Sequence, residues 1–463
     1  MTILKPLTPS LGRLPNAKQK FQHLVSVSRY TKLSQYRQRF NPAKIAQAAN
    51  LPRYIERGGE QSFAPPYQIK NAELYLFALK ANRQKLQALC DQYLNHPKSA
   101  FEYRPILGCV LLGFHGCESL IPAQTNLSFA QEGEVLFWIP VWKRLKSAAG
   151  QADAATQLSA PLMFTPYIFL NSSPALISGR EALGYPKQWG WVDFPKGGKL
   201  EQGGDLKLET LVWQAENKPS DETVQGKRDE LLSVSWASPW DWGQSWLDSN
   251  WRTLSSNLQW WSNALNPFFT HDAASVPPSP QPPSSTSKLF GTASGTVDAA
   301  IAAITTSLME VMTSADWDSQ YLGQTAQGKP CPKRLNTLIR SFCQHSFVNV
   351  FLKQFRDVRD AQNACYQAIV EAPCQSTKVH QIRLLKKHRL FKVKIKNTLS
   401  HPLVKELGLA PFDPNNAEQS YTVPARWLAW LNFDFKLEPG EIIWESKHHS
   451  RSGAREAYRH WYD

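Results

Sequence analysis

Residues 175–190 read ALISGREALGYPKQWG and present one lysine, Lys187, directly behind a Gly-Tyr-Pro turn. Aromatic residues flank this lysine in the sequence, at Tyr185, Trp189 and Trp191. A lysine attacks a carbonyl carbon only as the neutral amine, and its ordinary pKa of about 10.4 leaves less than about 0.1% of it neutral at pH 7. Burial or a neighbouring cation must therefore disfavour the ammonium form. We interpret the stretch as a turn that presents a partly buried amine; the alternative is an inert structural lysine.

The composition is that of a soluble globular protein with a substantial core, since 42% of the 463 residues are hydrophobic and 19% are charged. No apolar run approaches the roughly 18 residues of a membrane-spanning helix. The seven cysteines are scattered without a Cys-x-x-Cys pair, which argues against a disulfide framework and favours a reducing compartment. His115 and Cys117 lie close together, but two candidate ligands do not make a metal centre. We therefore predict no metal.

The net charge of +14 is concentrated in residues 1–57, which hold eleven Lys or Arg and one acid, Glu56. This segment is also rich in Ser and Thr, a composition typical of an organelle transit peptide. We favour instead a basic N-terminal extension (1–60) on a cytoplasmic protein, because the basic character runs past Arg53 without a clear cleavage boundary. A second basic run, 383–396, alternates apolar residues with lysines, which indicates one solvated face of a half-buried strand rather than a nucleic-acid site.

Short apolar runs dominate the sequence between residues 61 and 445. They are rich in β-branched and aromatic residues and punctuated by Gly and Pro, which favours strands of a mostly antiparallel sheet. We predict a first strand at 72–79, a strand at 174–179 (PALISG) and a last strand at 425–438. A helix follows the first strand, because four apolar residues recur there at helical spacing: Leu86, Leu89, Cys90 and Tyr93. The fold class that these patterns predict is α+β, mostly antiparallel β.

The predicted β-rich domain is split into two sequence halves, 61–214 and 336–445, by an insertion at 215–335. A polar tail follows at 446–463. The insertion combines three compositions: a Trp-rich segment (236–261), a Pro/Ser linker (275–287) and an amphipathic helix (about 297–313). The Trp-rich segment is typical of a packed subdomain or of a lid over the domain.

The stretch that contains Lys187 resembles the signature of the acetoacetate decarboxylase family, in which a Gly-Arg-Glu run leads to a Tyr-Pro-Lys turn. Upstream, EVLFWIPV is similar to that family's glutamate five residues before Ile-Pro-Val, which makes Glu134 the counterpart of its catalytic glutamate. The resemblance covers both β-rich halves. Its matching positions are Gly179, Arg180, Glu181, Tyr185, Pro186, Lys187 and Gly190.

The resemblance implies a closed β-barrel or cone, assembled into homo-oligomers, that acts on a small carbonyl substrate without a metal or organic cofactor. Lys187 would form a Schiff base with a β-keto acid, and the protonated imine would accept the electrons released as carbon dioxide leaves. Glu134 would orient the substrate or shuttle protons. Arg180 and Glu181 would support the pocket as a structural pair, and Tyr185 would form part of its wall.

The sequence also departs from the family. Gln188 stands where the family has a second lysine, so any lowering of the pKa of the amine must come from desolvation or from another cation, for which Lys143 and Arg144 are candidates. An approximate register places Ala72 at the family's active-site arginine and Val110 at its second acid. These departures favour a bulkier or less acidic carbonyl compound than acetoacetate.

Two functions follow from these observations. The first is an acetoacetate decarboxylase-like carbon–carbon lyase that acts on a β-keto acid or related carbonyl compound through Lys187. The second is a non-catalytic member of the same fold that holds an apolar carbonyl or lipid-like molecule, which Gln188, Ala72 and Val110 favour.

Overall fold

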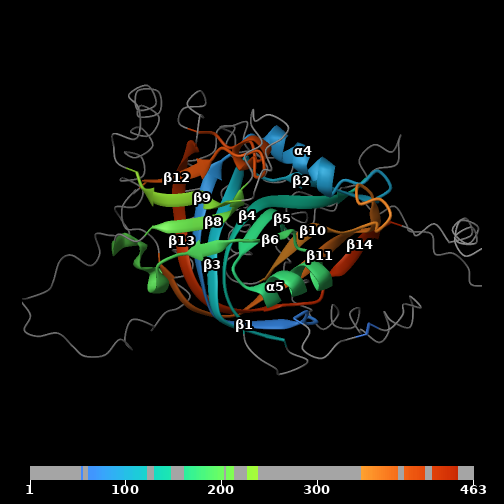
Figure 1. Ribbon diagram of the computed structural model, residues 1–463, viewed down its shortest axis with the longest axis horizontal. Helices are drawn as coiled ribbons and strands as arrows, with labels where there is room; N and C mark the ends of the chain where they lie inside the picture. Colours follow the sequence, from blue (N-terminus) through green and yellow to red (C-terminus); the bar gives the residue numbers. More distant parts are fainter. Residues whose placement is uncertain are drawn as a thin grey trace, which may run out of the picture. The chain divides into compact units, whose positions relative to one another are not determined.

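The computed structural model describes residues 54–55, 61–122, 130–146, 161–202, 205–212, 227–237, 346–383, 390–411 and 420–446, and most of these belong to one sheet of fourteen strands (Figure 1). The strands before residue 240 are β1 (Tyr67–Lys80), β2 (Phe101–Pro105), β3 (Cys109–Pro122), β4 (Ala130–Leu145), β5 (Leu162–Leu170), β6 (Lys187–Trp189), β7 (Trp191–Asp193), β8 (Leu206–Val212) and β9 (Lys227–Trp236). The later strands are β10 (Ser346–Arg356), β11 (Ala364–Arg383), β12 (Leu390–Lys396), β13 (Ser420–Leu437) and β14 (Glu441–Glu445).

The helical elements are short. They are α4 (Arg83–Tyr93), α5 (Ser173–Ser178), the π-helix η2 (Gly179–Leu183), the 3-10 helix η3 (Lys196–Gln202) and α10 (Leu403–Glu406). Within the described part of the chain, no helix has the length and apolar character that a membrane crossing requires. The prediction of a mostly antiparallel β fold is confirmed.

Seven strands form a ring in the order β11-β10-β5-β4-β3-β1-β13, because β11 also pairs with β13. The 20-residue β11 is long enough for both neighbours: Ala364 to Gln375 pairs with β10, and Cys374 to Arg383 pairs with β13. Only the contact of β10 with β5 is parallel within this ring. The ring includes only part of β13. The first part of β13 pairs with β12 and continues the sheet through β9, β8 and β7.

Strand β1 separates two hydrophobic cores because successive side chains of a strand point to opposite faces. Tyr75, Phe77 and Leu79 belong to the larger core, which also includes residues of β12 and α4. Their neighbours Leu74 and Leu76 belong to a second core on the other face. The second half of strand β1 is therefore buried on both faces, and it contains the continuous apolar run LYLFAL at 74–79.

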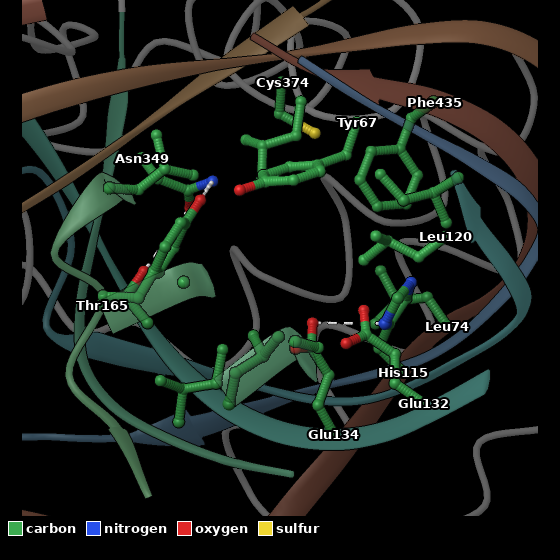
Figure 2. A pocket seen from close by; sticks show the side chains of 18 of the residues that line it. Tyr67, Leu74, His115, Leu120, Glu132, Glu134, Thr165, Asn349, Cys374 and Phe435 are labelled. Atoms are coloured by element: carbon green, nitrogen blue, oxygen red, sulfur yellow. Dashed lines mark hydrogen bonds and ion pairs between the residues drawn. The ribbon is translucent and has the colours of Figure 1, made fainter. Parts of the chain in front are cut away.

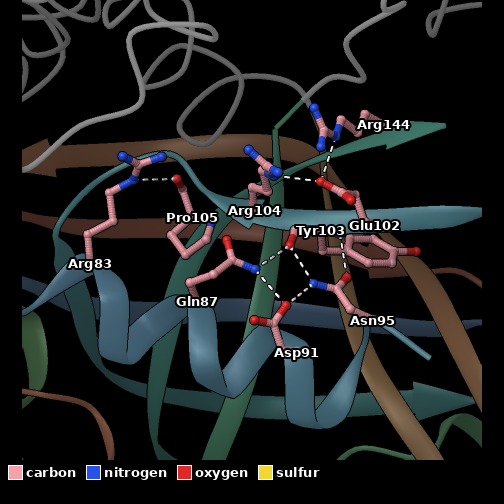
Figure 3. A network of polar contacts seen from close by, with 9 residues as sticks. All are labelled: Arg83, Gln87, Asp91, Asn95, Glu102, Tyr103, Arg104, Pro105 and Arg144. Carbon is pink, nitrogen blue, oxygen red and sulfur yellow. Dashed lines mark hydrogen bonds and ion pairs between the residues drawn. The ribbon is translucent and has the colours of Figure 1, made fainter. Parts of the chain in front are cut away.

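Side chains of helix α4 donate hydrogen bonds to backbone carbonyls of β2, from Arg83 to Pro105 at 3.2 Å and from Gln87 to Tyr103 at 3.3 Å (Figure 3). Its apolar side chains Leu86, Leu89 and Cys90 are buried, as their spacing predicts. The Asn95 side chain accepts a hydrogen bond from the Tyr103 backbone N–H at 2.6 Å and donates one to the Tyr103 carbonyl at 3.0 Å. Asn95, two residues beyond the end of α4, thereby satisfies both backbone groups of Tyr103 in the short strand β2.

Two sequence predictions differ from the structure. Residues 174–179 were predicted as a strand, but they form α5 and the start of η2. A short apolar run does not by itself distinguish the two, and Pro174 in the first turn favours the helix. The range assigned to the insertion also contains β9, which pairs with β8 and β12.

The other predicted segments lie outside the described residues. They are the bulk of the N-terminal extension, the Trp-rich segment beyond residue 237, the Pro/Ser linker, the helix at 297–313 and the C-terminal tail beyond residue 446.

Replacement of Phe77 tests the larger core. Phe77 is fully buried and packs edge-on against Phe391, with 5.3 Å between ring centroids. Phe77→Ala should lower the free energy of unfolding by about 3–5 kcal/mol, because it removes buried apolar surface and leaves a cavity. Urea denaturation measures this loss. Val358→Ala, at a residue 97% exposed, is the control and should change stability by less than about 0.5 kcal/mol; equal losses would contradict the core assignment.

Candidate active site

A cavity of about 90 Å³ lies within the ring of seven strands. Every strand of the ring contributes to its wall, and α5, η2 and β6 complete it. One water molecule needs roughly 10–15 Å³, so the cavity has room for a small molecule of several non-hydrogen atoms. Figure 2 shows labelled side chains from several strands around this central space. The apolar part of the wall consists of Ile69, Leu74, Leu120, Leu136, Trp138, Ile168, Ala175, Leu183, Phe347, Leu431, Phe433, Phe435 and Leu437.

Lys187 is the first residue of β6, which pairs with β5. Its side chain is buried and reaches the cavity, where Nζ lies 3.9 Å from Oε2 of Glu134. The same Nζ lies 5.7 Å from the centre of the Tyr185 ring. Lys187 provides the only primary amine among the described residues that line the cavity.

Gly179 leaves the space that the lysine side chain occupies. A Cβ atom at this position would lie 2.6 Å from Cδ and 2.7 Å from Cε of Lys187, far inside the normal separation of about 3.5–4.0 Å. Gly184 ends η2 with a φ of 93°, and a Cβ there would lie 2.3 Å from Cβ of Lys353. Gly179 and Gly184 are therefore both required by close packing around the Lys187 turn.

Arg180 and Tyr185 hold this turn in different ways. The Arg180 guanidinium donates a hydrogen bond of 2.8 Å to the backbone carbonyl of Lys187, although Arg180 does not line the cavity. Tyr185 does line it, and its hydroxyl accepts a hydrogen bond of 2.8 Å from the Asn349 amide. Glu181 is half-buried in η2 and is not part of the described wall.

Glu134 meets a histidine and a second glutamate in the cavity. His115 of β3 is the register partner of Glu134 on β4, and its Nδ1 lies 3.2 Å from Oε1 of Glu134 in an ion-pair contact (Figure 2). This contact is not aligned as a hydrogen bond. Glu132 precedes Glu134 by two residues and therefore points to the same face of β4. Oε2 of Glu132 and Nε2 of His115 have no hydrogen-bond partner within the part of the chain that the structure describes.

The two glutamates have opposite electrostatic environments. Burial is the main influence on Glu132 and raises its pKa, although the Lys187 ammonium partly offsets this effect. Burial also acts on Glu134, but contact with His115 and the charge of Lys187 hold its pKa below the usual value. Burial opposes the charged form of His115, yet the two carboxylates raise the pKa of the ring. The cavity therefore holds two different carboxylates together with the Lys187 amine: Glu134 favours its ionised form, and Glu132 binds a proton more readily.

These three residues could also hold a cation. Ligand atoms of His115, Glu132 and Glu134 lie within 4.8 Å of one another, and a histidine with two carboxylates is a chemically suitable donor set for a divalent transition metal. The Lys187 ammonium, 3.9 Å from Glu134, would compete with such an ion. The sequence prediction considered only His115 and Cys117 and did not find this cluster.

A hydrogen-bonded polar group lies elsewhere in the wall of the cavity. The Asn349 carbonyl oxygen accepts from the Trp138 indole at 3.1 Å and from the Thr165 hydroxyl at 3.5 Å, while its amide donates to Tyr185. All four residues line the cavity. Because Asn349 has an oxygen acceptor and an amide donor engaged, it fixes the orientation of the Tyr185 hydroxyl.

Gln188 was predicted to belong to the pocket, but it does not line it. Adjacent residues of a strand point to opposite faces, so Gln188 points away from the face that Lys187 occupies. Its Oε1 lies 2.9 Å from Nε2 of His401. The residue at position 188 therefore lies outside the cavity, so the absence of a lysine there bears less directly on the amine than the sequence suggested.

Four further positions also lie outside the described cavity wall: Ala72, Val110, Lys143 and Arg144. Lys143 binds Glu371 at 2.8 Å and Arg144 binds Glu102 at 2.5 Å, so the two candidate activating cations have carboxylate partners elsewhere. Val110 packs in the larger core with Phe77, on the opposite face of β3 from His115.

Ala72 lies beside a shift in the register of β1 between Ile69 and Ala72, which a register drawn from the sequence could not anticipate.

The residues that sequence reasoning missed came from pairing between distant segments. His115, Thr165 and Asn349 reach the cavity from three different strands. One signal was available for Glu132: its spacing of two residues from Glu134 places both carboxylates on the same face of a strand.

Comparison with solved structures gives the following matches. An acetoacetate decarboxylase from Legionella pneumophila shares 11% sequence identity and a TM-score of 0.40, with 85% of this chain and 92% of that chain covered. The enduracididine biosynthesis enzyme MppR shares 10% identity and a TM-score of 0.36, covering 83% and 90%. An acetoacetate decarboxylase-like enzyme from Sphingomonas wittichii shares 9% identity and a TM-score of 0.32, covering 84% and 98%. The chain resembles acetoacetate decarboxylases and enzymes like them. No protein-family model and no curated protein matches the sequence.

Glutamine substitutions at the two cavity glutamates should change stability in opposite directions. The raised pKa of Glu132 means that folding favours its protonated form, so stability falls as pH rises above the ordinary value of 4.5. Glu132→Gln should therefore raise the melting temperature at about pH 7, with the gain disappearing near pH 4. Glu134 has a lowered pKa, so Glu134→Gln should lower the melting temperature at about pH 7 and lose this effect as acid protonates the wild-type carboxylate.

Thermal denaturation of the wild type and both variants across this pH range measures the two effects. Changes of the same sign for both variants would contradict the assigned electrostatic environments.

Proposed function

We propose that this protein is a Schiff-base-forming carbon–carbon lyase that acts on a carbonyl compound, a β-keto acid or a related ketone, through Lys187. The observation that carries the proposal is the burial of the Lys187 amine in an enclosed cavity beside Glu134, 3.9 Å away. A lysine amine buried beside apolar side chains is the kind that forms imines with ketones, and Glu134 is close enough to balance the positive charge of the imine.

In this proposal the neutral Lys187 amine attacks the substrate carbonyl carbon, and the resulting carbinolamine loses water to form a protonated imine. The imine carries a positive charge at the nitrogen, close to the Glu134 carboxylate. A pre-positioned carboxylate stabilises this charge strongly in a cavity from which water is largely excluded. The imine then accepts the electron pair of the carbon–carbon bond that breaks, so the reaction needs no metal or organic cofactor.

Proton transfer is assigned to the glutamates. Lys187 must lose a proton before it attacks, and Glu132 and Glu134 are the carboxylates that line the described cavity. Glu134, with Oε2 3.9 Å from Nζ, is placed to exchange protons with the amine, and Glu132, with its raised pKa, is the stronger base of the two and can exchange protons with the substrate. Assembly into a homo-oligomer and a cytoplasmic location remain predictions from the sequence.

A non-catalytic binding protein is the second candidate, and the sequence favoured it through Gln188, Ala72 and Val110. None of these residues is part of the described cavity wall, so they do not bear on whether the amine reacts. The apolar wall is the observation that still favours simple ligand binding.

Borohydride trapping separates the two candidates. Incubation with acetone or pentan-2-one, reduction and peptide mass spectrometry should locate a covalent adduct on Lys187, and Lys187→Met should abolish it. Lys353→Met is a matched control, because burial lowers the pKa of Lys353 although that residue does not line the cavity. Labelling of Lys187 should persist in the control. Absence of any adduct on Lys187 in the wild type would refute the lyase.

Gly179→Ala tests whether the position of the amine matters. The new methyl group would occupy the space of the Lys187 side chain and displace the amine. A displacement of about 1 Å can reduce reactivity on the order of 10²-fold, so we expect a loss of that size in the trapping rate. Gly133→Ala is the control, since its nearest contacts are at an ordinary 3.4 Å and it should trap at a rate close to wild type. Equal rates in both variants would show that the Gly179 contact does not position the amine.

A further inference from the structure

The charged residues of the cavity wall restrict which substrates can bind more narrowly than the Lys187 amine does. Among the described residues of the wall, the groups that ionise readily are the carboxylates Glu132 and Glu134 and the bases Lys187 and His115. Lys187 becomes the imine nitrogen, and its single charge is already balanced by Glu134. No arginine, the side chain best suited to hold a carboxylate, lies in the described part of the wall.

A β-keto acid would bring a third carboxylate into this space. An unpaired buried charge costs several kcal/mol, and here it would lie near two like charges. His115 is the remaining base, but it is in contact with Glu134. The wall around these groups is apolar and includes Trp138, Phe347 and Phe433. The cavity therefore disfavours an anion and favours an uncharged molecule with hydrocarbon substituents.

The Tyr185 hydroxyl offers a neutral contact for such a molecule. It accepts from the Asn349 amide, which leaves its own hydrogen available to donate into the cavity. Its ring lies 5.7 Å from Nζ of Lys187, so an oxygen a few bonds from the imine carbon can reach it. Burial raises the pKa of Tyr185 well above its ordinary value, so the hydroxyl remains a donor. A carbonyl or hydroxyl oxygen is the natural acceptor.

The second glutamate indicates the reaction. Decarboxylation of an imine requires an electron sink and no base to remove a substrate proton. Cleavage of a β-hydroxy ketone also requires a base for the hydroxyl proton. Glu132, with an oxygen that lacks a partner in the described structure, lies on the same strand face as Glu134 and is available as that base.

We propose, resting on the imine chemistry of Lys187 proposed above, that the substrate is an uncharged β-hydroxy ketone and that the reaction is its retro-aldol cleavage. Lys187 and the ketone form a protonated imine and release water. Glu132 takes the hydroxyl proton, the carbon–carbon bond breaks, and its electron pair moves into the imine to give an enamine while an aldehyde leaves. Glu132 returns the proton to the enamine carbon. Water then hydrolyses the imine, so one β-hydroxy ketone yields one ketone and one aldehyde.

The first experiment compares acetoacetate with pentan-2-one, which carries an ethyl group in place of the carboxylate and forms an imine that borohydride reduces. Borohydride trapping on the wild-type protein should show a half-saturating concentration for pentan-2-one at least about tenfold lower than for acetoacetate. Equal or tighter trapping of acetoacetate, or release of carbon dioxide from it, would overturn the substrate class while leaving the Schiff base established. No adduct with either compound would refute the Schiff base itself.

The second experiment follows 4-hydroxypentan-2-one, which should be cleaved to acetone and acetaldehyde. Glu132→Gln should lower the rate of this cleavage by about 10²–10⁴-fold, because it removes the base, yet still form the trapped adduct. The same variant should trap acetoacetate at lower concentrations than wild type, because one negative charge is gone. Glu209→Gln, on strand β8 and outside the described cavity wall, should change neither result. Cleavage at the wild-type rate in Glu132→Gln would overturn the role of Glu132.

Discussion

The cavity depends on the pairing of β11 with both β10 and β13. Cys374 is the point of closure, because its register partners are Phe347 on β10 and Leu437 on β13. All three residues line the cavity. If β11 were shorter, the ring would be open at this position and water would reach the charged groups inside. Enclosure matters because two charges interact far more strongly in a protein interior than in water.

Inside the ring, packing places the amine and electrostatics differentiates the carboxylates. Gly179 permits the Lys187 side chain to cross the helical turn, and Arg180 holds the backbone carbonyl of Lys187 from outside the cavity. Glu132 and Glu134 share a strand face, yet close contact with His115 lowers the pKa of Glu134, whereas at Glu132 burial outweighs the charges of Lys187 and His115. One residue type therefore supplies both a counter-charge and a base, and the difference arises from a neighbour on another strand.

Prediction from sequence succeeded where the signal was local. The periodicity of Leu86, Leu89 and Cys90 predicted α4, and the Gly-Arg-Glu and Tyr-Pro-Lys runs indicated Lys187 as the residue to examine. Prediction from sequence failed where the face of a strand on which a side chain lies depends on the register of that strand. The irregularity of β1 next to Ala72 changes which residues face inward, and the alternation of β6 turns Gln188 outward toward His401. Such errors arise because a strand has a period of two, so a displacement of one residue exchanges its faces.

The sequence by itself determined the mostly antiparallel β character, helix α4 and the lysine behind a Gly-Tyr-Pro turn. These follow from interactions within a few residues: side-chain alternation, helical spacing and the conformational freedom of glycine. Only the tertiary structure decided that His115, Glu132 and Asn349 share a cavity with Lys187, and that Lys143 and Arg144 do not. The physical reason is that the register between β3 and β4, the closure of β11 on β13 and the resulting burial are set by contacts between distant segments, which no local pattern specifies.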